Sequence, residues 1–479
     1  MNALLISHLL GWLLIGLGVV QVVPIVGALA FGEPVLPYAA SAIAALACGL
    51  PVALSTQPTN RRIRSRDAFL VVGLAWFLAS LFGSLPYNLT GVLSTSDAIF
   101  ESSAGFTTTG STVMTAIEDA PRALLLWRSM TQWLGGMGII VFAIAVMPLL
   151  GVGGMQLFRA EMPGPVKSKL TPRVAETARR LWMIYLGLTM AEWVCLVLAG
   201  MSGFEALCHS FTTLSTGGFS TRNDSIGAFE SPVIQWIIIL FMALGGINFV
   251  LHYQAITGRI AEVLRNTELR YYLAILLFGT GIVAWVLWDP GVDGEATVRV
   301  SMFQVVALTT TTGYTTANFE VWPGLAILIL LQVMTLGGMA GSTSGGVKSL
   351  RTLIGLRTLS SALIRQLHPH AVTKPVRFGG VRVSDDVLAG IWTFFTAYAM
   401  TALVVAGVVA GAGYDILTSI SAALTTVGNV GPGLGQIGPT DHFAHFPTYV
   451  KLTLSAAMIA GRLEIITVVV VFHPDFWRR

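Results

Sequence analysis

The chain contains the stretch Phe106-Thr107-Thr108-Thr109-Gly110-Ser111-Thr112, a run of hydroxyl side chains around one glycine. Three later stretches share this pattern: Phe211-Thr212-Thr213-Leu214-Ser215-Thr216-Gly217-Gly218-Phe219, Thr309-Thr310-Thr311-Thr312-Gly313-Tyr314-Thr315 and Leu424-Thr425-Thr426-Val427-Gly428-Asn429. A single Thr-Thr-Gly sequence is common in turns. Four copies, each about ten residues after a short apolar segment and each ahead of a longer one, indicate an internal repeat of about 100 residues.

The rest of the chain is strongly apolar. Of its 479 residues, 54% are hydrophobic and 11% are charged, and the mean hydropathy is +0.74, whereas soluble domains carry about 25% charged residues. Segments of about 20 apolar residues, long enough to cross roughly 30 Å of hydrocarbon, recur from end to end. We predict an all-α polytopic membrane protein with about ten transmembrane helices, near residues 3–30, 36–56, 68–88, 123–150, 180–201, 232–256, 270–289, 322–347, 388–411 and 448–472.

The first apolar segment is expected to span the membrane rather than to be removed. Residues 3–31 exceed a signal-peptide h-region of about 7–15 residues, and no basic segment precedes them. The three cysteines, Cys48, Cys195 and Cys208, lie in or beside apolar segments without metal-ligand spacing, and we expect free thiols.

The distribution of charge predicts the orientation. An even number of spans places both termini on one side, and most of the 28 Lys and Arg residues fall on that side, in 61–66, 151–180, 257–270, 347–388 and 478–479. By the positive-inside rule that side is cytoplasmic. Acidic residues in the opposite loops would concentrate cations in an outer vestibule, although a solvated loop charge explains any one of them as well: Glu33, Asp97, Glu118, Asp119, Asp224, Glu230, Asp289, Asp293, Glu295, Glu320, Asp415 and Asp441.

The repeat predicts the architecture. Two N-terminal helices (1–60) precede four helix–pore loop–helix units, at 61–165, 166–262, 263–370 and 371–479. Non-helical backbone at membrane depth must line a cavity or be buried in protein, because lipid cannot satisfy its polar groups. We therefore expect the units to surround one pore. The short segments before the loops would be pore helices whose negative C-terminal ends favour a cation; they lie roughly at 96–106, 204–213, 299–309 and 415–424.

Four loops that converge on one axis would form rings of carbonyl oxygens that replace the hydration shell of an ion. Glycine tolerates positive φ, which lets successive carbonyls point at the axis, and threonine and serine hydroxyls supply a further ring of oxygens. Alignment on the glycines at 110, 217, 313 and 428 predicts the filter residues Thr108, Thr109, Gly110, Ser111, Ser215, Thr216, Gly217, Gly218, Thr311, Thr312, Gly313, Tyr314, Thr426, Val427, Gly428 and Asn429.

A second polar stretch interrupts the span predicted at 322–347. Five of the ten residues 337–346 are glycine, and each glycine is about 1 kcal/mol worse than alanine in a helix. We predict a short intramembrane loop beneath the filter that moves for ions to pass, although small residues also allow close helix packing. The predicted gate residues are Gly337, Gly338, Gly341, Ser342, Thr343, Ser344, Gly345, Gly346 and Arg462.

Arg462 lies well inside the last apolar segment, where an arginine costs at least about 3 kcal/mol and is a functional hypothesis by default. Glu464, two positions on, would point elsewhere on a helix, so we expect a partner on another helix or on the 337–346 loop. We predict that Arg462 forms an electrostatic barrier below the filter; a structural ion pair is the alternative. Glu192 is another buried charge without an assigned role, and His368-Pro369-His370 is expected to be solvated or to face a partner.

Three further motifs accompany the loops: Trp133-Leu134-Gly135-Gly136-Met137-Gly138, Gly337-Gly338-Met339-Ala340-Gly341-Ser342-Thr343-Ser344-Gly345-Gly346-Val347-Lys348 and Gly461-Arg462-Leu463-Glu464. The fourth loop, at 426–429, is similar to the filter of potassium channels. With these motifs the whole chain resembles the Trk/Ktr/HKT superfamily of potassium transporters. It is most similar to the TrkH branch, because two spans precede the four units.

The resemblance implies potassium uptake across a bacterial inner membrane by a homodimer embedded in lipid. It implies a cytosolic TrkA-type partner that binds a nucleotide, with no organic cofactor on this chain and no nucleic acid. Glycine at 110, where some sodium-passing relatives have serine, favours potassium, whereas the second loop departs from the pattern because it lacks a full threonine pair. Potassium would be held at Thr108, Thr109, Ser215, Thr216, Thr311, Thr312, Thr426 and Val427.

Other functions remain open. A sodium or mixed-cation conductor of the same superfamily would carry the same loops. An alternating-access transporter for a small solute would have inverted repeats, whereas these four loops repeat in one orientation. An enzyme has little support, because the sequence contains no HExxH, no Gly-x-Ser-x-Gly and no paired intramembrane aspartates.

Overall fold

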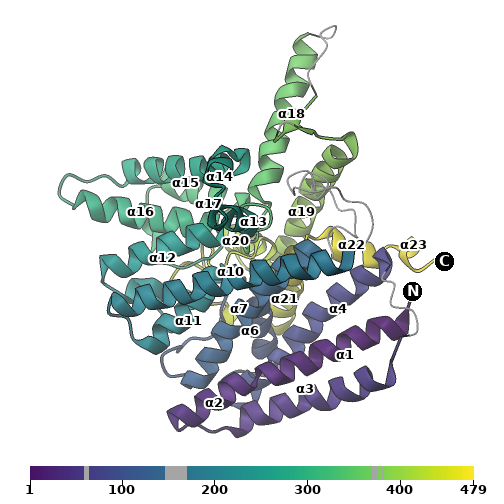
Figure 1. The fold of residues 1–479 in the computed structure, drawn as a ribbon. Helices are drawn as coiled ribbons and strands as arrows, with labels where there is room; N and C mark the ends of the chain where they lie inside the picture. The colour runs from purple at the N-terminus through teal and green to yellow at the C-terminus, as the bar shows by residue number, and fades with distance from the viewer. Residues whose placement is uncertain (59–63, 146–169, 369–374, 380, 479) are drawn as a thin grey trace.

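The computed structural model describes residues 1–58, 64–145, 170–368, 375–379 and 381–478, and these residues are mostly helical (Figure 1). The predicted all-α fold is confirmed, and within the described residues each predicted span coincides with a helix or a pair of helices, except that the span at 322–347 is helical only as far as Leu336. They are α1 (Ala3–Val20), α2 (Val22–Phe31), α3 (Leu36–Ser55), α4 (Ser65–Gly83), α5 (Leu85–Leu89), α7 (Arg122–Ala145), α10 (Leu170–Leu198), α12 (Pro232–Gly245), α13 (Phe249–Ile256), α15 (Thr267–Val286), α17 (Gly324–Leu336), α19 (Asp385–Gly411), α21 (Thr448–Arg462) and α22 (Ile466–Phe472).

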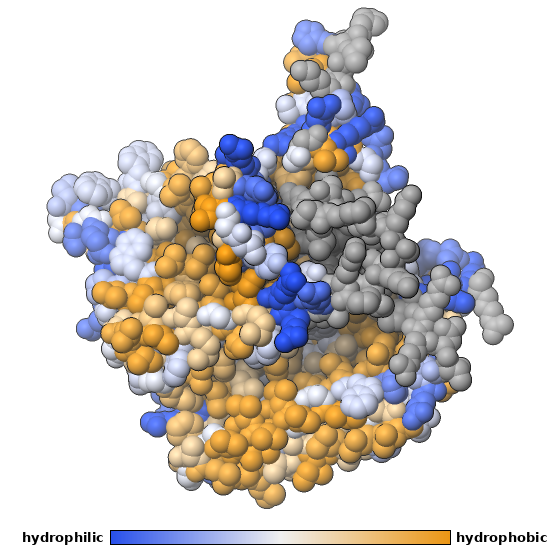
Figure 2. Space-filling view, in the orientation of Figure 1, coloured by the Kyte–Doolittle hydropathy of each residue, from blue (hydrophilic) through white to orange (hydrophobic). Residues whose placement is uncertain are grey.

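These helices make a multi-pass membrane protein. Within the described residues, six stretches are long and apolar enough to cross a membrane, or eight if each of two bent pairs is one span. The pair α12–α13 bends by 101° and the pair α21–α22 by 114°. Large apolar side chains are exposed on the outside, for example Leu198 at 81% and Phe278 at 74%. Figure 2 shows this hydrophobic surface over the body of the molecule, as expected where lipid replaces water.

Four shorter helices occupy the predicted pore-helix positions: α6 (Thr95–Phe106), α11 (Gly203–Leu214), α16 (Gly294–Thr309) and α20 (Ile416–Gly428). Each begins at a side chain that accepts a hydrogen bond from a backbone N–H of the first turn: Ser94, Ser202, Asp293 and Asp415. Two predicted bounds were wrong, because α16 starts five residues before 299 and α20 ends four residues after 424.

Acidic groups sit at the N-terminal end of every pore helix, in the cap or the first turn: Asp97, Glu205, Glu295 and Asp415. The Arg299 side chain, hydrogen bonded to Glu295, lowers the pKa of that carboxyl. The hydrogen bonds from Thr418 likewise lower the pKa of Asp415. These two groups therefore stay ionised at neutral pH beside the positive helix N-termini, while the negative helix ends point inward.

The four units close into a ring. In each unit both long helices pack on the unit's own pore helix, as α4 and α7 do on α6. The second long helix also packs on the pore helix of the next unit: α7 on α11, α12 on α16, α17 on α20, and α21 back on α6. The last contact joins the fourth unit to the first, so the pore helices surround one axis, while α1 and α2 pack outside on α4 and α7.

The remaining elements lie at the predicted cytoplasmic side. They are α14 (Ile260–Arg265), α18 (Ser349–Leu367), α23 (Pro474–Trp477) and an antiparallel pair, β1 (Arg377–Phe378) and β2 (Val381–Arg382). α18 extends away from the body (Figure 1), and hydrophilic residues gather on it in Figure 2. The three cysteines are free thiols, as predicted. The basic residues predicted in 151–169, the boundary at 165/166 and His370 lie outside the described residues.

Candidate functional site

The four loops share one backbone conformation directly after their pore helices. A residue with left-handed φ comes first, at Thr108, Thr216, Thr311 and Asn429, with φ between 53° and 57°. Two positions later a glycine again has positive φ, at Gly110, Gly218, Gly313 and Gly431. Because positive φ recurs at every second residue, successive carbonyls can turn to the same side of the chain, which is what a ring of ion ligands requires.

The same glycines show that the loops meet. A Cβ placed on Gly110 would lie within 3.0 Å of the carbonyl oxygen of Gly217, and one on Gly218 would lie as close to that of Thr312. In the same way Gly313 faces the carbonyl of Val430, and Gly431 faces that of Thr109. Each glycine thus contacts the next unit in chain order, and the fourth contacts the first. Only glycine fits at these four positions, because real Cβ atoms are not found that close to another atom.

This conformation corrects the alignment of the glycines. The predicted set placed Gly217 and Gly428 with Gly110 and Gly313, but the equivalent residues are Gly218 and Gly431. Thr426, Val427 and Gly428 form the last turn of α20, where Thr426 Oγ1 donates to the Ala422 carbonyl at 2.6 Å. The fourth loop therefore reads Asn429-Val430-Gly431. Two Val-Gly pairs lie three residues apart, and the local pattern does not distinguish them.

The other predicted filter residues lie in or beside the ring. Thr109 and Thr312 are equivalent, and their hydroxyls bond those of Thr107 and Thr310 at 2.7 and 2.8 Å. The Tyr314 hydroxyl turns away from the ring to Thr212 Oγ1 at 2.5 Å. The predicted residues that occupy the four turns are Thr108, Thr109, Gly110, Ser111, Thr216, Gly217, Gly218, Thr311, Thr312, Gly313, Tyr314 and Asn429, with Ser215 at the end of α11.

A small cavity of about 70 Å³ lies above the ring and is lined by all four positive-φ glycines. Its charged lining residues are Asp441, Arg128 and Arg222. Of the twelve outer acids singled out from the sequence, Asp441 lines this cavity, whereas several others cap helices, as Glu33 does for the backbone N–H groups of Arg122 and Ala123. Within the described residues, the cavity above the ring is therefore lined by fewer acidic residues than the sequence predicted.

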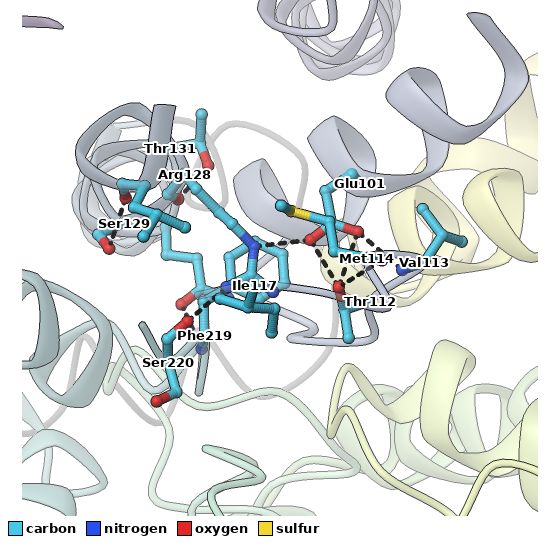
Figure 3. Close-up of polar contacts among 12 residues, drawn as sticks. Glu101, Thr112, Val113, Met114, Ile117, Arg128, Ser129, Thr131, Phe219 and Ser220 are labelled. Carbon is cyan, nitrogen blue, oxygen red and sulfur yellow. Dashed lines mark hydrogen bonds and ion pairs between the residues drawn. The ribbon is translucent and has the colours of Figure 1, made fainter. Parts of the chain in front are cut away.

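A buried ion pair holds the first two loops together (Figure 3). Arg128 Nε lies 2.7 Å from Glu101 Oε1, with both side chains almost fully buried. Glu101 also accepts from Thr112 Oγ1 and from the Val113 N–H, both at 2.9 Å. Arg128 Nη1 donates to the Ser220 carbonyl at 2.8 Å. Glu101 thus holds the segment that follows the first loop, and Arg128 holds the segment that follows the second.

Removing one member of this pair is expected to destabilise the fold. Arg128→Met leaves Glu101 as an uncompensated buried carboxylate, and the expected loss is about 3–5 kcal/mol of unfolding free energy. Thermal melts in detergent measure it. Arg222→Met is the control, because the Arg222 side chain is 45% exposed beside Glu205 and such pairs contribute about 1 kcal/mol or less. Equal shifts in the two variants would contradict the assigned role.

The predicted break in the third unit is confirmed. α17 ends at Leu336, and residues 337–348 form a loop with positive φ at Gly337, Gly341 and Gly346. Thr343 Oγ1 donates to the carbonyls of Leu214 and Gly245 at 3.0 and 3.1 Å. The loop thereby contacts the inner end of the second pore helix.

The same loop also contacts the third and fourth units. The Gly345 N–H donates to Thr311 Oγ1 at 2.6 Å, and the Gly346 N–H donates to the Gly428 carbonyl at 2.8 Å. The remaining predicted gate residues, Gly338, Ser342 and Ser344, lie in this loop, with the two serine hydroxyls 2.7 Å apart. The loop therefore contacts the ends of the second and fourth pore helices and the turn after the third; that it is a gate beneath a filter stays a prediction.

Arg462 meets this loop from the fourth unit. It is 3% exposed and ends α21, where the chain breaks before α22. Its Nη1 donates to the Thr343 carbonyl at 2.7 Å, while Nε and Nη2 have no hydrogen-bond partner among the described residues. The expected partner on the 337–346 loop is thus present, and Glu464 instead pairs with Arg351 at 2.5 Å.

Several buried residues at the site were missed by the sequence analysis. Glu268 accepts from the Ala340 N–H at 2.7 Å and from Ser349 Oγ at 2.9 Å, so it holds the 337–348 loop at Ala340 and directly after its last residue. Gln132 donates to the Gly217 carbonyl at 2.7 Å. Glu101 and Arg128 carried the same signal as Arg462, a charge inside or beside an apolar segment. Gln132 carried no signal of its own. Glu192 is buried in α10, near Thr213 of the second pore helix.

The glycine motif at 133–138 also has a place in this site. A Cβ on Gly135 would lie within 3.0 Å of the Phe106 carbonyl, and one on Gly136 would lie 2.9 Å from Ser215 Cα. Gly461 approaches the Val427 carbonyl in the same way. These glycines let the second long helix of a unit pack directly against the inner ends of the pore helices.

Comparisons with known proteins place the chain in a family. The family model for TrkH, described as a cation transport protein, matches residues 38–290 and 291–479. Trk system potassium uptake protein TrkH of Halomonas elongata is 40% identical over 487 residues and covers 100% of both chains. The protein of that name from Escherichia coli K12 is 41% identical and covers 91% of this chain and 90% of its own. The crystal structure of the potassium transporter TrkH from Vibrio parahaemolyticus superposes with a TM-score of 0.92 at 35% identity, over 100% of both chains.

Proposed function

The chain belongs to the TrkH family of cation transport proteins, and from this premise we propose that it takes up potassium through the ring formed by its four filter loops. The observation that carries the proposal is the closed ring of carbonyls at Thr109, Gly217, Thr312 and Val430, each against a positive-φ glycine of the neighbouring unit. The family is one of transporters, not enzymes. Potassium is the cargo, and no organic cofactor is assigned to this chain.

The ions pass the filter first and the gate second. Filter carbonyls replace the water around the ion, and the inner ends of the pore helices add negative potential. Below the ring, the 337–348 loop and the Arg462 guanidinium close the path, since the loop bonds the second, third and fourth units. Opening requires these contacts to break.

Membership of the family also suggests the membrane location, the oligomeric state and the regulatory partner of the chain. We propose a bacterial inner-membrane location with both termini cytoplasmic, a homodimer, and control by a cytosolic TrkA-type subunit that carries the nucleotide. The relatives are named potassium uptake proteins of a Trk system, and the word system favours further components. The exposed Arg365 and the half-buried Arg357 on α18 give a cytosolic partner a basic surface to bind.

Purified full-length chain in liposomes tests the function. Rubidium or potassium flux is compared with sodium flux, with and without the regulatory subunit. We expect potassium and rubidium to pass and sodium to be excluded. Equal sodium flux would favour the second candidate, a mixed monovalent-cation conductor of the same family. Absence of any cation flux in the presence of the regulatory subunit would overturn the proposal.

A further inference from the structure

We propose that Gln132, a residue of α7 outside the four loops, sets the cation selectivity of the second loop by holding the carbonyl of Gly217. The inference rests on the proposed function, because it concerns the same ring. Gln132 belongs to the first unit but contacts the loop of the second. Its side chain is fully buried.

The ring is not uniform in its hydrogen bonding. Its four members are the carbonyls that precede the positive-φ glycines, at Thr109, Gly217, Thr312 and Val430. Within the described residues, the Gly217 carbonyl alone of these four accepts a hydrogen bond from a side chain, from Gln132 Nε2 at 2.7 Å. That carbonyl presents less free negative potential to an ion than the other three, and its position is restrained.

Gln132 also explains why the second loop lacks a threonine pair. Thr109 and Thr312 stand at the position equivalent to Gly217, and each supports its own loop through a hydroxyl contact. At Gly217 the space for a side chain is taken, since a Cβ there would lie within 3.0 Å of the Gln132 amide. Gln132 therefore replaces the missing threonine from a different helix.

The Gln132 side chain forms hydrogen bonds on both sides of the filter glycine Gly218. Gln132 Oε1 accepts from the Phe219 N–H at 3.0 Å, so one amide holds the residues before and after Gly218. One helical turn away, the Arg128 guanidinium lies 3.6 Å from the centre of the Phe219 ring. The second loop is thus held by α7, and a ring held at its potassium-binding size resists contraction around the smaller sodium ion.

Flux measurements in liposomes test this role. Gln132→Ala is expected to keep potassium flux but to lower the potassium-to-sodium ratio by roughly 2- to 10-fold, the effect of one lost hydrogen bond. Gln235→Ala is the matched control, because Gln235 Nε2 donates to the Phe229 carbonyl, outside the ring, at 3.0 Å. Its ratio should equal that of the wild type.

A second pair of variants separates selectivity from folding. Gly217→Thr alone is expected to clash with the Gln132 amide and to lose selective flux. Gln132→Ala/Gly217→Thr makes room for the side chain and restores the Thr-Thr-Gly pattern of the first and third loops, so at least half of the wild-type ratio should return. An unchanged ratio in Gln132→Ala, or a double variant no better than the single ones, would overturn the inference.

The two proposals fail in different ways. Absence of cation flux in the wild type would overturn the proposed function. The coupling between positions 132 and 217 would still appear as non-additive shifts in thermal melts of the same four proteins, since residues in contact do not act additively. Additive shifts in melting temperature would show that residues 132 and 217 do not interact.

Discussion

Gly313→Ala is expected to abolish selective potassium flux, whereas Gly428→Ala is expected to leave most of it. Gly313 has φ of 76°, and a Cβ there would lie within 3.0 Å of the Val430 carbonyl and of Pro432 Cδ. The left-handed conformation alone costs an alanine about 1–2 kcal/mol, and the backbone of the neighbouring loop cannot move away without opening the ring. That conformational cost alone corresponds to about a 5- to 30-fold loss of flux, and the clash with the neighbouring loop adds to it.

Gly428 is the matched control because it is also a glycine beside the ring. It lies in the last turn of α20 with helical φ, and its Cβ would lie 3.2 Å from the Tyr398 hydroxyl and 3.3 Å from Val430 Cγ2. Those side-chain atoms can shift by a few tenths of an ångström. Liposome flux and gel filtration compare the two variants. If Gly428→Ala lost flux as completely as Gly313→Ala, the filter register derived from the backbone would be wrong.

Arg462→Ala is expected to raise potassium flux in the absence of the regulatory subunit by at least about tenfold. Two unit charges 4 Å apart interact by about 4 kcal/mol at an effective dielectric constant of 20, so a buried guanidinium below the filter opposes a passing cation strongly. The substitution also removes the bond that ties Thr343 to α21. Flux into liposomes that hold the chain alone measures the effect.

Two further variants sharpen this test. Arg462→Lys keeps the charge and is expected to keep flux low, which separates the barrier from loss of packing. Gly345→Ala keeps Arg462 but displaces the loop, since a Cβ there would lie within 3.0 Å of the Gly428 carbonyl; it is expected to leak. Unchanged flux in Arg462→Ala would exclude the electrostatic barrier and leave a structural contact.

The sequence predicted the features that depend on neighbouring residues along the chain. Hydropathy placed the spans, and the glycine content of 337–346 predicted the break after α17. The charge at Arg462 pointed to the gate, because an arginine inside an apolar segment needs a partner. The same rule applies to Arg128, but its partner Glu101 lies 27 residues away in another helix, and no local pattern indicates that pair.

The register of the filter was predicted wrongly in two of four loops. Gly217 and Gly218 are adjacent, and Gly428 and Gly431 both follow a valine, so the local sequence allows either choice. The choice is made by contacts with the neighbouring unit: Gly218 against the Thr312 carbonyl, and Gly431 at 2.8 Å from the Thr109 carbonyl. These contacts join residues more than 90 positions apart, which no local pattern records.

The sequence by itself thus determined a membrane protein of four repeated units with polar loops, because composition and hydropathy act over short stretches of chain. Only the tertiary structure decided which glycine of each loop joins the ring and where the buried charges find partners. It also decided that a glutamine of one unit holds a carbonyl of the next. The physical reason is that a left-handed glycine, a buried charge and a carbonyl oxygen each depend on the groups that surround them. Those groups are brought within reach by helix packing and lie far away along the chain.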